Sequence, residues 1–239
     1  MSSEPTFSFA FQPVVDTATG KAYSHEALVR GLNGEGAFSV LSRFPGDAAT
    51  AFDAACRARA IEVACKIGIS TSLNINMLPN SVFSSEFGLA STIRAAEQFG
   101  FPLDRLIVES TEVDAIEDAR HFAQTMNSYR DLGIRLAIDD FGAGHAGLGL
   151  LAEFQPDIIK LDMVLVRAIN SNGPRQAIVR AIVQVCADLG IDVVAEGVET
   201  PEEFQWLDGA GVHLFQGYLF AKPGFETMPA FTLPSAGRS

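Results

Sequence analysis

Short apolar runs alternate with longer amphipathic stretches along most of the chain. The first two runs, FSFAFQPVV (7–15) and KAYSHEALVRG (21–31), are joined by the turn-rich DTATG, which predicts an antiparallel pair of strands. Further strands rich in Val, Ile and Leu are predicted at residues 69–76, 105–110, 134–139, 157–162, 192–197 and 212–217. Amphipathic stretches that run up to a glycine predict helices at residues 47–68, 89–100, 118–133 and 174–190.

This order of elements indicates the fold class. Strands that alternate with helices form a parallel sheet, and so many repeats within 239 residues favour closure into one α/β barrel over an open doubly wound sheet. We therefore expect a single domain over residues 1–239, with a frayed tail at 230–239.

Composition narrows the classes of partner. Seventeen Lys and Arg against twenty-nine Asp and Glu give a net charge of -12, which argues against a nucleic-acid polymer as the partner. No basic and apolar leader and no apolar stretch of about twenty residues is found, so we expect no membrane span and a cytoplasmic location. Cys56, Cys65 and Cys186 show no CxxC spacing and are expected to be reduced packing residues.

Polar residues end the predicted strands. They are Asn74, Asn76, Glu109, Asp139, Asp140, Lys160, Asp162, Glu196 and Gln216. In a parallel barrel the C-terminal ends of the strands meet at one rim, so these side chains should converge. Asp139 and Asp140 are neighbours, and both can serve one site because the strand gives way to a loop there and strict alternation of faces lapses.

Clustered carboxylates need cations, because close like charges raise one another's pKa. The available ligands are oxygens of Asp, Glu and Asn, which suit Mg²⁺ or Mn²⁺ and argue against zinc. One carboxylate shared between two ions would build the two-metal clamp used for displacement at phosphorus. Lys160 can hold a phosphate oxygen or the attacking water, and its alternative role is a structural ion pair.

Six motifs give the chain a family resemblance. FQPVV, HEALVRG with Glu26-Ala27-Leu28, DDFGAG, KLD, AEGVET and QGYLFAKP occur in the order seen in the EAL-domain cyclic di-GMP phosphodiesterases. The chain resembles this family from about residue 7 to residue 223. The resemblance implies a modified TIM (β/α)8 barrel with an antiparallel opening strand, two Mg²⁺ or Mn²⁺ ions, hydrolysis of cyclic di-GMP to linear pGpG, and a homodimer. The family usually couples its barrel to a sensor, receiver or cyclase domain.

The resemblance also implies roles for individual residues. Metal ligands would be Glu26, Glu109, Asp139, Asp140 and an asparagine, for which the family spacing favours Asn76 over Asn74. Lys160 would position the attacking water with support from Asp162, and Glu196 would act near it as a ligand relay or general base. Gln12 and Arg30 match positions that contact the substrate phosphates, while Gln216 either reaches the site or only orders the last strand.

The loop after the paired aspartates departs from the family pattern. Glu112 matches the glutamate that anchors this loop, but His145 replaces the usual tyrosine and Ala146-Gly147 replace two serines. The departure puts loop rigidity and dimer coupling in doubt and leaves the predicted ligands intact. Two alternatives accompany the enzyme hypothesis. One is a catalytically silent EAL domain that binds cyclic di-GMP as a receptor. The other is an enolase-like metal barrel, which shares the acid-lined rim and a lysine but leaves the ordered motifs unexplained.

Overall fold

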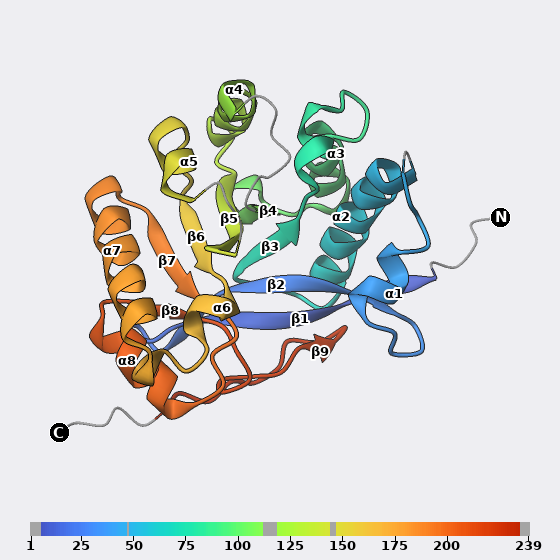
Figure 1. Cartoon of the computed structure of the whole chain (residues 1–239). Coiled ribbons are helices and arrows are strands. Elements are labelled where there is room, and N and C mark those ends of the chain that lie inside the picture. The colour runs from blue at the N-terminus through green and yellow to red at the C-terminus, as the bar shows by residue number, and fades with distance from the viewer. Residues whose placement is uncertain (1–5, 47, 112–118, 144–146, 235–239) are drawn as a thin grey trace.

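A computed structural model describes residues 6–46, 48–111, 119–143 and 147–234 (Figure 1). The strands are β1 (Phe7–Asp16), β2 (Lys21–Gly31), β3 (Ser72–Asn76), β4 (Leu106–Thr111), β5 (Arg135–Phe141), β6 (Ile158–Leu161), β7 (Asp192–Ala195), β8 (Leu214–Phe215) and β9 (Gly224–Phe225). The α-helices are α1 (Ala37–Leu41), α2 (Ala48–Lys66), α3 (Leu89–Phe99), α4 (Ala119–Arg130), α5 (Gly147–Glu153), α6 (Met163–Val166), α7 (Gly173–Leu189) and α8 (Pro201–Gly209). Short 3-10 helices are η1 (Pro79–Phe83), η2 (Leu103–Arg105) and η3 (Ile169–Ser171).

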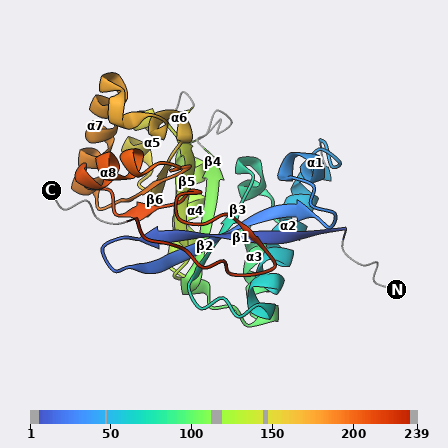
Figure 2. The ribbon, with the colours of Figure 1, turned by 90° about the horizontal axis from the view of Figure 1, so that it is seen from below.

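The first eight strands close into a barrel. Strands β2 to β8 pair in chain order and in parallel, and β1 closes the ring by antiparallel pairing with both β2 and β8. Helices surround the ring, and seen from below β1 and β2 lie side by side across the molecule (Figures 1 and 2). The predicted modified TIM barrel with an antiparallel opening strand is confirmed. Strand β9, which was not predicted, pairs with β1 at Ala10 and Phe11.

The short helices α1, α5, α6 and α8 were missed by the sequence analysis. The start of α8 nevertheless carried a sequence signal for a helix, because Thr200 and Glu203 form a capping box and Pro201 occupies the first helical turn. The longer predicted helices are found at α2, α3, α4 and α7, each of which extends over eleven or more residues. Helix α2 is the least amphipathic of the four, because it buries Asp53 and Arg57 together with its apolar residues.

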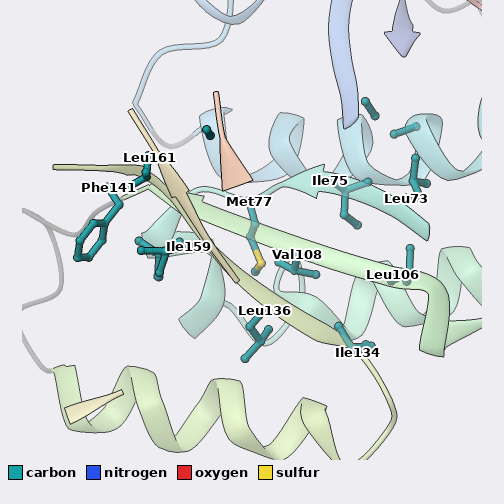
Figure 3. Close-up of a cluster of buried hydrophobic side chains, with 14 of the residues drawn as sticks. Leu73, Ile75, Met77, Leu106, Val108, Ile134, Leu136, Phe141, Ile159 and Leu161 are labelled. Carbon is teal, nitrogen blue, oxygen red and sulfur yellow. The ribbon is translucent and has the colours of Figure 1, made fainter. Parts of the chain in front are cut away.

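Both faces of the parallel strands are buried, which explains their nearly continuous apolar sequences. Inside the barrel, one residue from each of six strands forms a small apolar layer of Val14, Ile107, Ala137, Ile158, Val194 and Leu214. The alternate residues face outward and pack with the helices in the main core, which Figure 3 shows for neighbours such as Val108, Leu136 and Ile159. The next inward-facing position on each strand therefore lies directly above the apolar layer.

A polar network lies at the end of the barrel where the parallel strands begin. Arg135 donates to the Tyr23 hydroxyl over 2.5 Å and to Ser72 over 2.6 Å, and the Tyr23 hydroxyl donates to Asp192 over 3.2 Å. Burial and the nearby Asp192 outweigh Arg135 and raise the pKa of Tyr23 to about 12. This network links β2, β3, β5 and β7 beneath the apolar layer.

Three further expectations concern the cysteines, a membrane span and the C-terminal tail. Cys56, Cys65 and Cys186 have free thiols, as predicted for packing residues. Within the described residues, no helix combines the length and apolarity needed to cross a bilayer. In the predicted tail, the Thr232 backbone N–H donates to the Phe220 carbonyl over 3.1 Å, while 235–239 lie outside the described residues.

Candidate functional site

A polar layer lies one inward-facing step above the apolar layer of the barrel. Glu109, Asp139 and Lys160 each follow a residue of the apolar layer by two positions on the same strand, and Glu196 and Gln216 do so just beyond the ends of β7 and β8. Gln12 occupies the equivalent place on β1, which runs the other way. Side chains from six or more strands thus meet at the rim that receives the C-terminal ends of the parallel strands.

Lys160 lies at the centre of this polar layer. Its ammonium Nζ is 2.7 Å from Glu196, 2.8 Å from Glu109, 3.1 Å from Asp139 and 3.4 Å from Glu26. Both Lys160 and Glu109 are 1% exposed or less. One lysine cannot neutralise four carboxylates, so some of them must take up protons or bind a further cation.

The pKa values respond to this crowding. Burial raises the pKa of Glu109 to about 8 even though Lys160 lies beside it, and burial with repulsion from Asp139 raises the pKa of Asp140 to about 6. Burial also raises the pKa of Glu196. For Lys160, burial is outweighed by the four carboxylates, which hold its pKa well above the ordinary value. Glu109, Asp140 and Glu196 can therefore release a proton when a cation binds.

Asp139 and Asp140 reach the same site through a break in the strand. The pairing of β5 with β6 shifts register between Ile138 and Phe141, and Asp140 has a left-handed φ of 53°. Carboxylate oxygens of Asp139 and Asp140 come within 4.8 Å of each other and of Glu196, while Asp139 also forms a second such group with Glu26 and Glu109. The predicted convergence of the adjacent aspartates is explained by this bulge.

Both candidate asparagines contact the carboxylates. Asn74 is buried and donates to Glu109 over 2.6 Å, and its Oδ1 has no hydrogen-bond partner among the described atoms. Asn76 lies at the exposed rim and donates to Glu26 over 3.2 Å. The two side chains share the inner face of β3, so strand alternation does not separate them, and Asn76 stays the predicted ligand on the family spacing alone.

The glutamines belong to the same network. Gln216 donates to Glu26 over 2.8 Å and to Gln12 over 3.4 Å, and Gln12 donates to the Ala221 carbonyl over 3.0 Å. Gln216 therefore reaches the site and also links β8 to β1. Arg30 is different, because its side chain is half-buried and donates to the Val29 carbonyl over 2.8 Å.

Asp162 lies at the base of the short helix α6. Its carboxylate caps that helix by accepting the Val164 backbone N–H over 2.6 Å, and it also faces Asp140.

A cavity of about 300 Å³ opens over this part of the site. Its lining includes residues that the sequence analysis did not select, namely Met163, Gly197, Glu199, Gly217 and Tyr218. Glu199 and Tyr218 lie within the AEGVET and QGYLFAKP motifs, which was the available signal.

A second cavity of about 470 Å³ adjoins the first at Glu26. It lies between the barrel wall and the helices α1 and α2, and its lining is largely apolar, with Phe9, Phe44 and Phe52 among its walls. Asn76, Asp53 and Arg57 also line it. The site therefore combines an acidic cavity and an apolar cavity that meet at one predicted metal ligand.

The donor set fits hard divalent cations. The two overlapping groups of carboxylates share Asp139, and the described residues offer no cysteine or histidine ligand beside them. The neighbouring buried Asn74 Oδ1 is an unused acceptor. Glu26, Glu109, Asp139, Asp140 and Glu196 are thus the residues that could hold two ions. Glu112, His145 and Ala146, which the sequence analysis assigned to the adjoining loop, lie outside the described residues.

Comparison with curated proteins finds relatives longer than this chain. The blue light- and temperature-regulated antirepressor BluF of Escherichia coli K12 is 37% identical over 95% of this chain and 56% of its own length. Cyclic di-GMP phosphodiesterase PA2567 of Pseudomonas aeruginosa is 31% identical over 93% of this chain and 39% of its own length. The chain therefore spans about half or less of these relatives.

Comparison with solved structures confirms the fold and adds a full-length match. A standalone EAL protein of Vibrio cholerae O395, in its cyclic di-GMP-bound form, covers 100% of both chains with a TM-score of 0.91 and 44% identity. Klebsiella pneumoniae BlrP1, in a calcium and cyclic di-GMP complex, covers 97% of this chain and 60% of its own, with a TM-score of 0.90 and 37% identity. A family model for the EAL domain matches residues 2–223. The chain belongs to the EAL domain family.

Proposed function

We propose that this protein hydrolyses one phosphodiester of cyclic di-GMP to give linear pGpG, with two divalent ions, Mg²⁺ or Mn²⁺, bound at the barrel rim. The observation that carries the proposal is the pair of carboxylate groups that share Asp139, Glu26 with Glu109 on one side and Asp140 with Glu196 on the other. A shared carboxylate between two ions is the arrangement that clamps an in-line displacement at phosphorus.

The reaction adds water across one P–O bond. The water oxygen bonds to phosphorus, the bond to the 3′ oxygen breaks, and a proton reaches that departing oxygen. Paired divalent ions activate a water and neutralise phosphate charge when bound. Lys160 would stay protonated and orient the water or a phosphate oxygen, because the surrounding carboxylates hold its pKa high. Glu196 can accept a proton from the water, and Asp162 would hold Asp140 and the start of α6 in place.

The two adjoining cavities suit the shape of a cyclic dinucleotide. The acidic cavity would take the reacting phosphodiester, and the apolar cavity would take one guanine beside the wall formed by the stacked rings of Phe44 and Phe52. Arg30, at the end of β2 beyond Glu26, would turn from the Val29 carbonyl to a substrate phosphate, for which a guanidinium is a bidentate donor. A homodimer and a cytoplasmic location are part of the same proposal.

The direct test is incubation of the purified protein with cyclic di-GMP and Mg²⁺ or Mn²⁺, followed by chromatography for pGpG. We expect metal-dependent pGpG that disappears in EDTA and in the Glu26→Ala variant. Arg94→Ala is a suitable control, since Arg94 is on the exposed side of α3 and contacts only the Glu86 carbonyl in the described interactions. Absence of product with both metals would refute the proposal.

A second candidate function is a cyclic di-GMP receptor without turnover. It is favoured by the 37% identity to BluF, whose name describes a regulator of repression. This candidate predicts tight binding of cyclic di-GMP by the wild-type protein with no pGpG formed, so the same incubation, read by equilibrium dialysis, separates the two functions.

A further inference from the structure

Arg57 is a fully buried cation outside the carboxylate cluster. It lies on α2 with 1% of its surface exposed. Its guanidinium is held on several sides: Nε donates to Thr92 on α3 over 2.7 Å, Nη2 donates to the Phe87 carbonyl over 2.5 Å, and Nη1 forms an ion pair with Asp53. Nothing in the catalytic proposal uses this group.

The partner of Arg57 continues the chain of contacts toward the candidate site. Asp53 Oδ1 accepts the Leu78 backbone N–H over 3.3 Å. Leu78 follows the end of β3 by two residues, and the intervening Met77 N–H donates to the Glu109 carbonyl over 2.8 Å. The segment that carries Asn76 is thus fixed from one side by β4 and from the other by the Asp53–Arg57 pair.

The cost of burying charges indicates that the Asp53–Arg57 ion pair has a role beyond stabilising the fold. A buried ion pair loses hydration on both groups, and well-packed apolar residues of similar size are often at least as stable. Arg57 and Asp53 also line the apolar cavity that opens at Glu26 and Asn76. We propose that Arg57 is a positioning residue that acts through Asp53 to hold the end of β3, and with it Asn76, in the geometry that binds a divalent ion. The metal part of this inference rests on the proposed function.

The chain supplies a control pair with the same kinds of contact, although this pair is partly exposed. Arg130 pairs with Asp157 over 2.8 Å, and Asp157 accepts the Leu136 backbone N–H over 2.8 Å. This arrangement also joins an arginine and an aspartate to a strand amide, but at the end of the barrel where β5 and β6 begin. Arg130→Met should therefore disturb the fold locally without reaching the metal ligands.

The experiment compares wild type, Arg57→Met and Arg130→Met at a temperature where thermal melts show all three folded. Mn²⁺ binding is followed by electron paramagnetic resonance of the free ion, and amide hydrogen exchange is followed in peptides that contain Met77 and Leu78. We expect Arg57→Met to weaken Mn²⁺ binding about 10-fold or more, because the loss of a residue that orients a metal ligand commonly has an effect of this size. Hydrogen exchange at these amides should become faster. Arg130→Met should leave both quantities unchanged.

Equal Mn²⁺ affinity and equal exchange in wild type and Arg57→Met would overturn the inference. If Arg57→Met does not fold, Asp53→Asn removes the ion pair itself, and unchanged binding and exchange in that variant would overturn it equally. The two proposals can fail separately. If the wild type binds Mn²⁺ but forms no pGpG, the proposed hydrolysis is refuted. Faster exchange in Arg57→Met would then still support the positioning role.

Discussion

The ammonium of Lys160 lies 2.8 Å from Oε2 of Glu109, and neither side chain is more than 1% exposed. The two residues belong to β6 and β4, which are separated in the sheet by β5. Such a contact requires side chains that cross the barrel interior above its apolar layer. It makes Lys160 the shared counter-ion of the four carboxylates around it.

Replacing this counter-ion should weaken both the fold and the reaction. Lys160→Met leaves four carboxylates without their shared cation, so we expect a loss of about 3–5 kcal/mol in the free energy of unfolding at pH 7 without metal. We also expect turnover to fall about 100-fold or more, as when a preorganised donor is removed. Urea unfolding with and without Mn²⁺ and the pGpG assay measure the two effects. Wild-type turnover in this variant would contradict the role given to Lys160.

Metal binding should strengthen as the pH rises. The pKa of Glu109 is raised to about 8 and that of Asp140 to about 6, so each carboxyl holds a proton below that pH and must lose it to bind an ion. The apparent Mn²⁺ affinity should therefore increase between pH 6 and pH 9. Calorimetric titrations at four pH values, corrected for buffer ionisation, measure this slope. An affinity that is constant over the range would argue against Glu109 as a ligand.

Replacing Asn74 and Asn76 one at a time should have different effects on metal binding and on stability. Asn76→Ala is expected to weaken Mn²⁺ binding about 10-fold or more with little change in stability, because Asn76 is exposed at the rim. Asn74→Ala removes a buried hydrogen bond to Glu109 and should cost about 1–3 kcal/mol of stability. Metal titration and urea unfolding of both variants decide between them. The reverse pattern would make Asn74 the ligand.

The hydrogen bonds of Tyr23, at the end of the barrel where the parallel strands begin, should make the stability of the fold depend on pH in the alkaline range. The folded-state pKa of Tyr23, about 12, lies above the ordinary value of 10.0, so the folded protein keeps a proton that the unfolded chain releases. Its stabilising contribution is complete below pH 10 and is lost as the pH rises from 10 through 12. Unfolding of wild type and Tyr23→Phe at pH 9 to 11.5 should show a steeper decline for wild type. Parallel curves would mean that Tyr23 ionises normally.

Gly217 should tolerate no side chain. A Cβ at this position would lie 2.0 Å from the Val198 carbonyl oxygen, where the chain after β8 crosses the loop after β7. Gly217→Ala should lower stability by about 1–3 kcal/mol and displace the neighbouring Gln216. Gly209→Ala is the control, because Gly209 ends α8 with open space around it. Thermal melts of the two variants compare them, and equal melting temperatures would show that the crossing can relax.

Periodicity was a good guide wherever an element had enough residues to show it. The apolar runs of β4, β5 and β6 and the amphipathic pattern of α7 were readable because each repeats its spacing over most of the element. Helices α1 and α6, of five and four residues, contain little more than one turn and carry no period. The ordered motifs then indicated the family, which the family match over residues 2–223 confirmed.

The sequence by itself determined which polar residues end the strands and hence which chemistry the rim can hold. Only the tertiary structure decided their partners. Lys160 contacts four carboxylates, Asp140 reaches the site of Asp139 because its own backbone is left-handed at a break in register, and Gln216 donates a hydrogen bond to Glu26. The physical reason is that strand periodicity specifies the face of a side chain but not its neighbour across a closed barrel. That neighbour depends on the stagger of the strands in the ring that β1 closes, and on local breaks in register such as the one between β5 and β6.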